Sequence, residues 1–272
     1  MSQHTNAPKP PTVQAFRQAK AKGQKLSVVT CYDAWSAKTL NASDVDALLV
    51  GDSVAMVLHG HPNTLAATSE MMALHTAAVA RGAPHKLLIG DMPFLSFRKG
   101  LGPAMESAEL LMRAGAHALK LEGVDGHEDV VDALVKSGIP VMGHVGLTPQ
   151  SLHGLGGFRV QGKDDAAAAE ILRQAKRLEE LGCFSIVLEC VPTALGERLT
   201  SALSIPTIGI GAGPHCDGQV LVLHDLLGVD SSFRPRFVRR FADFEGGLRE
   251  AVATYSRAVR DGSFPNAEES YA

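Results

Sequence analysis

The chain has 272 residues, of which 45% are hydrophobic and 20% charged, and its formal net charge is −3. This near-neutral balance gives no electrostatic basis for binding nucleic acid or an anionic membrane, and 5% aromatic residues are too few for a base-stacking surface. No apolar run approaches the length of a membrane-spanning helix. The composition instead fits one globular domain near the upper size for a single core.

The cysteines and the chain ends indicate the compartment and the domain limits. The four cysteines have no CxxC spacing, so neither a disulfide framework nor a zinc knuckle is expected, and a reducing cytoplasm is the predicted location. Residues 1–12 are polar and Pro-rich without a secretory apolar segment, and 263–272 are similar. We expect two flexible tails around one folded domain over residues 13–262.

Between the tails, short apolar runs alternate with longer amphipathic segments. The runs are mostly continuous, as expected for strands that are covered on both faces, and the segments between them have helical periodicity. In chain order the predicted strands lie at 26–33, 46–53, 86–94, 117–123, 139–146, 184–191, 205–213 and 218–225. The predicted helices lie at 69–82, 103–116, 128–138, 164–182 and 241–262.

Eight strand candidates with intervening helices predict a (β/α)₈ TIM barrel, which typically takes about 250 residues. An open doubly wound sheet is the alternative, because periodicity does not distinguish the two. Strand count and chain length favour the barrel. The last predicted helix either closes the barrel or packs on a neighbouring subunit.

Charged residues stand at the carboxyl ends of five predicted strands. In a barrel these ends converge on one mouth, where active sites lie. For any one residue, a strand end meeting solvent or a helix cap is an equally good explanation, and Lys120 with Glu122 is equally a surface ion pair. The whole set favours a common pocket, since buried charges need partners. The residues are Asp52, Asp91, Lys120, Glu122, His144 and Glu189.

The carboxylates in this set point to a hard divalent cation. Oxygen ligands without a Cys or His cluster suit Mg²⁺, which keeps several waters and binds substrate oxygens. Mg²⁺ chelated by a 2-oxo acid stabilises an enolate, and that chemistry requires a base outside the inner coordination shell. Glu189, on a later strand, is our candidate for the base.

Three further patterns are weaker. His59 and His61 form an HxH pair of the kind that binds zinc in some barrel hydrolases. The Gly-rich segments 154–157 and 209–213 have backbone N–H groups suited to a phosphate or carboxylate. Cys190 and Cys216 are candidate nucleophiles, although buried inert thiols are commoner.

Six segments, taken together and in order, resemble the ketopantoate hydroxymethyltransferase family over about residues 13–262. They are VGDSVAMVLHGHPNTL (50–65), GDMPFLSF (90–97), LKLEG (119–123), GHVGLTPQS (143–151), VLECVP (187–192) and IGIGAGPHCDGQVLVLHDLLG (208–228). The resemblance implies a TIM barrel of the phosphoenolpyruvate/pyruvate superfamily. The implied activity is transfer of a hydroxymethyl group from 5,10-methylenetetrahydrofolate to 3-methyl-2-oxobutanoate, giving 2-dehydropantoate for pantothenate synthesis.

The same resemblance implies roles for individual residues. Asp52, Asp91 and Glu122 are the implied Mg²⁺ site, and Asp52 and Asp91 also lie against the substrate. Ser53, Lys120 and His144 are implied substrate contacts. Glu189 is the implied proton acceptor. The family also implies a homo-oligomer, commonly a decamer.

Three other functions remain open at this point. A folate-independent, Mg²⁺-dependent lyase or aldolase acting on a 2-oxo acid has the same superfamily background. A zinc amidohydrolase would use His59 and His61. A barrel that only binds an oxo acid or folate is the non-enzymatic alternative, and the intact acidic residues Asp52, Asp91, Glu122 and Glu189 argue against it.

Overall fold

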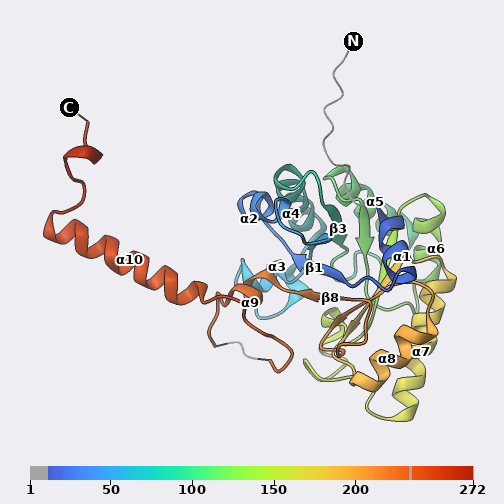
Figure 1. Ribbon diagram of the computed structural model, residues 1–272. Coiled ribbons are helices and arrows are strands. Elements are labelled where there is room, and N and C mark those ends of the chain that lie inside the picture. The colour runs from blue at the N-terminus through green and yellow to red at the C-terminus, as the bar shows by residue number, and fades with distance from the viewer. Residues whose placement is uncertain (1–11, 233–234, 272) are drawn as a thin grey trace. The chain divides into compact units, whose positions relative to one another are not determined.

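The computed structural model describes residues 12–232 and 235–271. Eight parallel strands pair in sequence order, and β8 pairs with β1, so the sheet closes (Figure 1). This confirms the barrel and excludes the open sheet. Of the predicted N-terminal tail, residues 1–11 lie outside the described part of the chain.

The strands occupy all eight predicted runs in shorter form. They are β1 (Leu26–Thr30), β2 (Ala47–Val50), β3 (Leu87–Asp91), β4 (Ala118–Lys120), β5 (Val141–Gly146), β6 (Ser185–Glu189), β7 (Thr207–Ile210) and β8 (Gly218–Leu221). The helices are α1 (Val13–Ala21), α2 (Ala34–Asn41), α3 (Val54–Val57), α4 (Ser69–Gly82), α5 (Leu101–Arg113), α6 (Glu128–Lys136), α7 (Asp165–Glu180), α8 (Thr193–Ala202), α9 (Leu223–Leu227) and α10 (Phe244–Asp261). Short 3₁₀ turns are η1 (Thr64–Ala66), η2 (Pro149–Ser151) and η3 (Ala267–Glu269).

Alternation along the strands produces two cores. On β2, Ala47 and Leu49 belong to the core inside the barrel, whereas Leu48 and Val50 belong to the core between barrel and helices. Successive side chains of a strand point to opposite faces, so a continuous apolar run fills both cores. Neighbouring helices pack around the outside, with α2 against α4, α4 against α5, α5 against α6 and α7 against α8.

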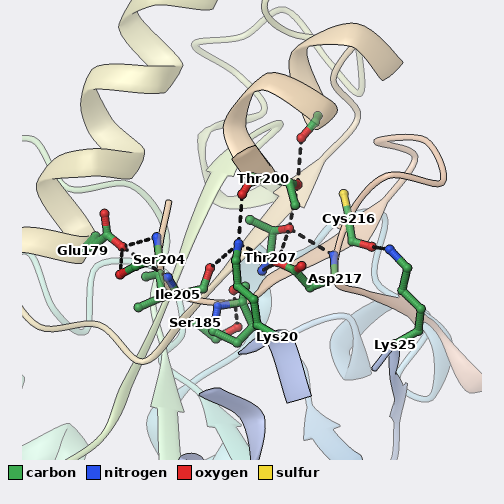
Figure 2. A network of polar contacts seen from close by, with 12 residues as sticks. Lys20, Lys25, Glu179, Ser185, Thr200, Ser204, Ile205, Thr207, Cys216 and Asp217 are labelled. Atoms are coloured by element: carbon green, nitrogen blue, oxygen red, sulfur yellow. Dashed lines mark hydrogen bonds and ion pairs between the residues drawn. The ribbon is translucent and has the colours of Figure 1, made fainter. Parts of the chain in front are cut away.

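The amino-terminal end of the barrel is closed by α1, a helix that the sequence pattern did not predict. Phe16 of α1 is buried in the inner core and packs edge-on against Phe184. Nearby, the Lys20 ammonium donates to the carbonyls of Thr200 and Ile205 at 2.9 and 3.1 Å and to the Asp217 carboxylate at 2.9 Å (Figure 2). One cation therefore ties α1 to the segments around β7 and β8.

Residues from Leu223 onward form a second compact unit. It contains α9, α10 and η3. The amphipathic helix α10 has no buried residue, and its apolar side chains Phe244, Leu248, Val252, Tyr255 and Val259 are all exposed. Among the described residues, no helix is both long and apolar enough to cross a membrane.

We predict that Lys20→Met lowers the free energy of unfolding by about 1–3 kcal/mol, because it removes three hydrogen bonds and leaves the Asp217 carboxylate without its cation. Urea denaturation measures the change. The matched control is Lys22→Met, which removes an exposed lysine and should change stability by less than about 0.5 kcal/mol. Equal effects of the two substitutions would contradict the role of Lys20.

Candidate active site

On the inward-facing side of the strands, apolar core residues come first and ionisable groups follow at the carboxyl ends. On β3, Leu87 and Ile89 fill the barrel core and Asp91 follows in the same alternation. On β5, Met142 is in the core and His144 follows. By the same two-residue period, Lys120 follows Ala118 on β4 and Glu189 follows Val187 on β6. The barrel thus brings these side chains to its carboxyl-terminal mouth.

A buried ion pair stands at the centre of this mouth. The Lys120 ammonium donates to both carboxylate oxygens of Asp91, at 2.8 and 2.7 Å. It also lies 3.7 Å from Oε1 of Glu122. All three residues are almost fully buried, so this is not the surface ion pair that the sequence left open.

His144 lies between two carboxylates. Its Nδ1 is 3.5 Å from Oε1 of Glu122, and its Nε2 is 3.3 Å from Oε2 of Glu189. These contacts lie within ion-pair range but are not well-formed hydrogen bonds. Burial alone would lower the pKa of His144, but the two carboxylates outweigh it and raise that pKa to about 9. The two carboxylates therefore favour the imidazolium form of His144.

The charges in the cluster perturb one another. Burial and the neighbouring carboxylates raise the pKa of Asp52 well above its usual value, and burial also raises that of Asp91 despite Lys120. Burial would raise the pKa of Glu122 as well, yet Lys120 and His144 hold it below its usual value. Burial opposes protonation of Lys120, but the surrounding carboxylates raise its pKa. Lys120 thus favours the ionised form of all three carboxylates and His144 that of Glu122, but only at Glu122 do these cations outweigh burial.

Gln150 is a central residue that sequence reasoning missed. Its side-chain amide donates to Oδ2 of Asp52 at 2.9 Å and to the Met92 carbonyl at 3.0 Å. Its backbone N–H donates to Oε2 of Glu122 at 3.0 Å. Gln150 is neutral and lies in the turn η2, so a pattern of charges at strand ends does not include it. It does lie within one of the segments that carry the family resemblance.

Ser53 is placed by a second residue that was not predicted, Tyr32. The two hydroxyls are 2.8 Å apart. Ser53 lies at the start of the short helix α3, directly after Asp52, whose backbone N–H donates to Oδ2 of Asp91 at 3.2 Å. The segment carrying Asp52 and Ser53 is therefore held at both residues. The structure thus brings all seven predicted residues to the barrel mouth.

Oxygen atoms in this cluster have the chemistry of a Mg²⁺ site. Oε1 of Glu122 is buried and has no hydrogen-bond partner, so it can accept a cation or a water molecule. Asp52 and Asp91 contribute further carboxylate oxygens on the adjoining strands. Among the described residues, no three His, Cys, Asp or Glu side chains form a complete metal site by themselves. Mg²⁺ commonly takes one or two carboxylates and completes its shell with water and substrate oxygens, and these residues fit that pattern.

The histidines and cysteines that were singled out do not join the cluster. The partner of His59 is His75 rather than His61, with Nε2 atoms 3.0 Å apart. Burial raises the pKa of the Cys190 thiol to about 12 and also raises that of Cys216, so both thiols are protonated at neutral pH.

A cavity of about 370 Å³ borders the site. Gly123, which follows Glu122, lines it, as do Thr148 and Ser151 on either side of Gln150. Arg98, whose guanidinium donates to the carbonyl of Glu122 at 3.1 Å, forms part of the same wall. The cavity therefore lies next to the segments that carry Glu122 and Gln150, although none of the seven predicted residues lines it.

The family model described as ketopantoate hydroxymethyltransferase matches residues 10–267. The chain belongs to this family. It is 52% identical to a 3-methyl-2-oxobutanoate hydroxymethyltransferase of Coxiella burnetii over 93% of this chain and 96% of the relative. The enzyme of that name from Bdellovibrio bacteriovorus is also 52% identical, over 96% and 99% of the two chains. The predicted family membership is confirmed, and the chain is an enzyme.

Solved structures share the barrel fold. A phosphonopyruvate hydrolase in complex with oxalate and Mg²⁺ superposes with a TM-score of 0.64 at 14% identity, covering 95% of this chain and 93% of the other. A 2,3-dimethylmalate lyase, described as a PEP mutase/isocitrate lyase superfamily member, gives 0.60 at 15% identity, covering 95% and 91%. At such low identity the likeness concerns the barrel and not the reaction.

We predict that Lys120→Met destabilises the fold in a pH-dependent manner, measured by denaturation at pH 5 and pH 8. Without the ammonium, Asp52 and Asp91 are still harder to ionise when folded. A raised folded pKa makes folding take up protons, so stability falls as pH rises from the unfolded pKa to the folded pKa. The loss should be smaller at pH 5 than at pH 8, where it reaches roughly 3–5 kcal/mol.

The matched control is Lys136→Met, which breaks the exposed ion pair with Asp132. Its effect should stay below about 1 kcal/mol at both pH values. A Lys120→Met effect that is independent of pH would show that the ammonium does not hold these carboxylates in their ionised form.

Proposed function

We propose that this enzyme transfers the one-carbon unit of 5,10-methylenetetrahydrofolate to 3-methyl-2-oxobutanoate and forms 2-dehydropantoate. The observation that carries the proposal is the buried Asp91–Lys120–Glu122–His144 chain ending at Glu189, in a member of this family. It combines oxygen ligands, two fixed positive charges and one more accessible carboxylate at a single barrel mouth.

Asp52, Asp91 and Glu122 would hold Mg²⁺ through their carboxylate oxygens. When bound, the ion withdraws electron density from the 2-oxo group and so acidifies the C3 hydrogen. Gln150 supports two of these carboxylates by hydrogen bonds. Such support of metal ligands fixes their orientation.

Positive charge and hydroxyl groups orient the oxo acid. Lys120 and His144 are the cations of the cluster, and an anionic 2-oxo acid gains from both. The Ser53 hydroxyl, held by Tyr32, provides a neutral hydrogen bond at the edge of the site. Together with Asp52 and Asp91, these residues form the proposed substrate contacts.

Glu189 is the proposed proton acceptor. Its side chain is 16% exposed, in contrast to the other carboxylates of the cluster, so substrate can reach it. His144 places a positive charge 3.3 Å from the carboxylate. Removal of the C3 proton gives an enolate, and its C3 bonds to the methylene carbon as the bond from that carbon to one folate nitrogen breaks. Water supplies the hydroxyl group as the bond to the second folate nitrogen breaks. The two nitrogens take up the C3 proton and a proton from water, and tetrahydrofolate leaves.

The remaining assignments concern the folate and the assembly. The cavity lined by Gly123 and Thr148 is the proposed space for the second substrate. The family resemblance is our basis for proposing a homo-oligomer, most simply a homodecamer. The cysteine pattern is our basis for proposing a location in the cytoplasm. The exposed apolar face of α10 is consistent with subunit contacts.

The direct test is incubation of the purified enzyme with both substrates. We expect 2-dehydropantoate to form with 5,10-methylenetetrahydrofolate and Mg²⁺, and the rate to fall to background when chelator removes the ion. Mass spectrometry of the product measures this. Folded protein that gives no product would overturn the proposal, and cleavage of a C–C bond in a larger 2-oxo acid without folate would establish the lyase alternative.

A further inference from the structure

A pair of histidines outside the active site has the geometry of a metal chelate. His59 follows the short helix α3, and His75 lies on α4. Their Nε2 atoms are 3.0 Å apart, with ring centroids at 5.2 Å and planes inclined by 74°. The two nitrogens therefore face each other directly.

The other nitrogen of His75 determines which atom is free to bind an ion. Nδ1 of His75 lies 2.6 Å from the backbone carbonyl of Tyr32. A carbonyl only accepts hydrogen bonds, so Nδ1 carries the proton and, in the neutral ring, Nε2 carries the lone pair. Metal-binding histidines commonly have this arrangement, in which a backbone carbonyl fixes the tautomer and orients the ring.

The distance between the two nitrogens suits a shared ion with a small adjustment. Zn²⁺ binds imidazole nitrogen at about 2.0–2.1 Å, which separates two ligands of a tetrahedral ion by roughly 3.3 Å. The His59 side chain is exposed and that of His75 is partly exposed, so the rings can turn by this amount and an ion can enter. The proton that now joins the two rings would be displaced.

We propose that His59 and His75 form a second metal site, specific for a transition-metal ion such as Zn²⁺ or Cu²⁺. Its imidazole ligands differ in kind from the oxygen ligands of the Mg²⁺ site, so the two sites select different ions. Within the described residues no third His, Cys, Asp or Glu completes the group, and water fills the other positions. The proposal stands independently of the reaction proposed above.

An ion bound at this site would restrain the segment that carries Ser53, the proposed substrate contact. His59 lies just beyond the carboxyl end of α3, and Ser53 is at its start. Tyr32 contacts His75 through its carbonyl and Ser53 through its hydroxyl, at 2.6 and 2.8 Å. An ion bridging the two rings would therefore add a second link between α3 and α4, beside the link that Tyr32 already makes from His75 to Ser53.

The test uses the full-length enzyme with saturating Mg²⁺, so that the carboxylate site is filled. Zn²⁺ is titrated by calorimetry, and Cu²⁺ is followed by electron paramagnetic resonance. We expect one ion per chain, nitrogen hyperfine coupling from two imidazoles, and a melting temperature that rises with Zn²⁺. His59→Gln and His75→Gln should each weaken binding by about 100-fold, because chelation by two ligands is lost.

The controls are His61→Gln, the other half of the HxH pair, and His215→Gln, another exposed histidine. Both should bind like the unsubstituted enzyme. His59 is exposed, so its substitution tests the site even if His75→Gln disturbs folding. Unchanged affinity and an unchanged spectrum in His59→Gln would overturn the proposal, as would loss of binding in His61→Gln.

Discussion

The need to neutralise buried charge governs the whole barrel mouth. Asp91 at the end of β3, and Asp52 and Glu122 just after β2 and β4, are three carboxylates that would each be costly to ionise alone in this environment. The Lys120 ammonium, in contact with Asp91 and 3.7 Å from Glu122, lowers the cost of ionising both. The imidazolium of His144 extends the same compensation to Glu189. The charge pattern of the proposed site is thus present in the protein before a substrate or an ion binds.

The barrel supplies these charges without a separate scaffold. A single strand contributes apolar side chains to the inner core and, two residues further on, an ionisable group to the mouth, as Ile89 and Asp91 do on β3. At the opposite end, α1 and the Lys20 contacts close the barrel. The packing of the inner core and the placement of the ionisable groups at the mouth therefore depend on the same strand register. A one-residue slip would move both sets of side chains to the wrong face.

The sequence was most informative where the physics is local. Continuous apolar runs located all eight strands, and the helix at 69–82 has the bounds that its periodicity predicted. Charges at strand ends identified Asp91, Lys120, Glu122, His144 and Glu189, because a barrel makes those ends converge. The near-neutral total charge carried none of this information, since it does not record position.

What the sequence did not predict depends on contacts between distant segments. Gln150 is neutral and lies in a turn, and its importance follows only from its hydrogen bonds to Asp52 and Glu122. Tyr32 acts through Ser53, a residue far along the chain. His59 is two residues from His61 in sequence but pairs in space with His75. In each case the partner lies on another element, and a single sequence without contacts does not identify it.

The central claim is that this cluster generates an enolate at C3 of the oxo acid with Glu189 as the base. Exchange of the C3 hydrogen of 3-methyl-2-oxobutanoate in D₂O, with Mg²⁺ and without folate, measures that step directly by NMR. We predict exchange by the unsubstituted enzyme and a rate at least about 100-fold lower in Glu189→Gln, with oxo-acid binding retained. Undiminished exchange in Glu189→Gln, or loss of exchange only in proportion to lost binding, would contradict the account.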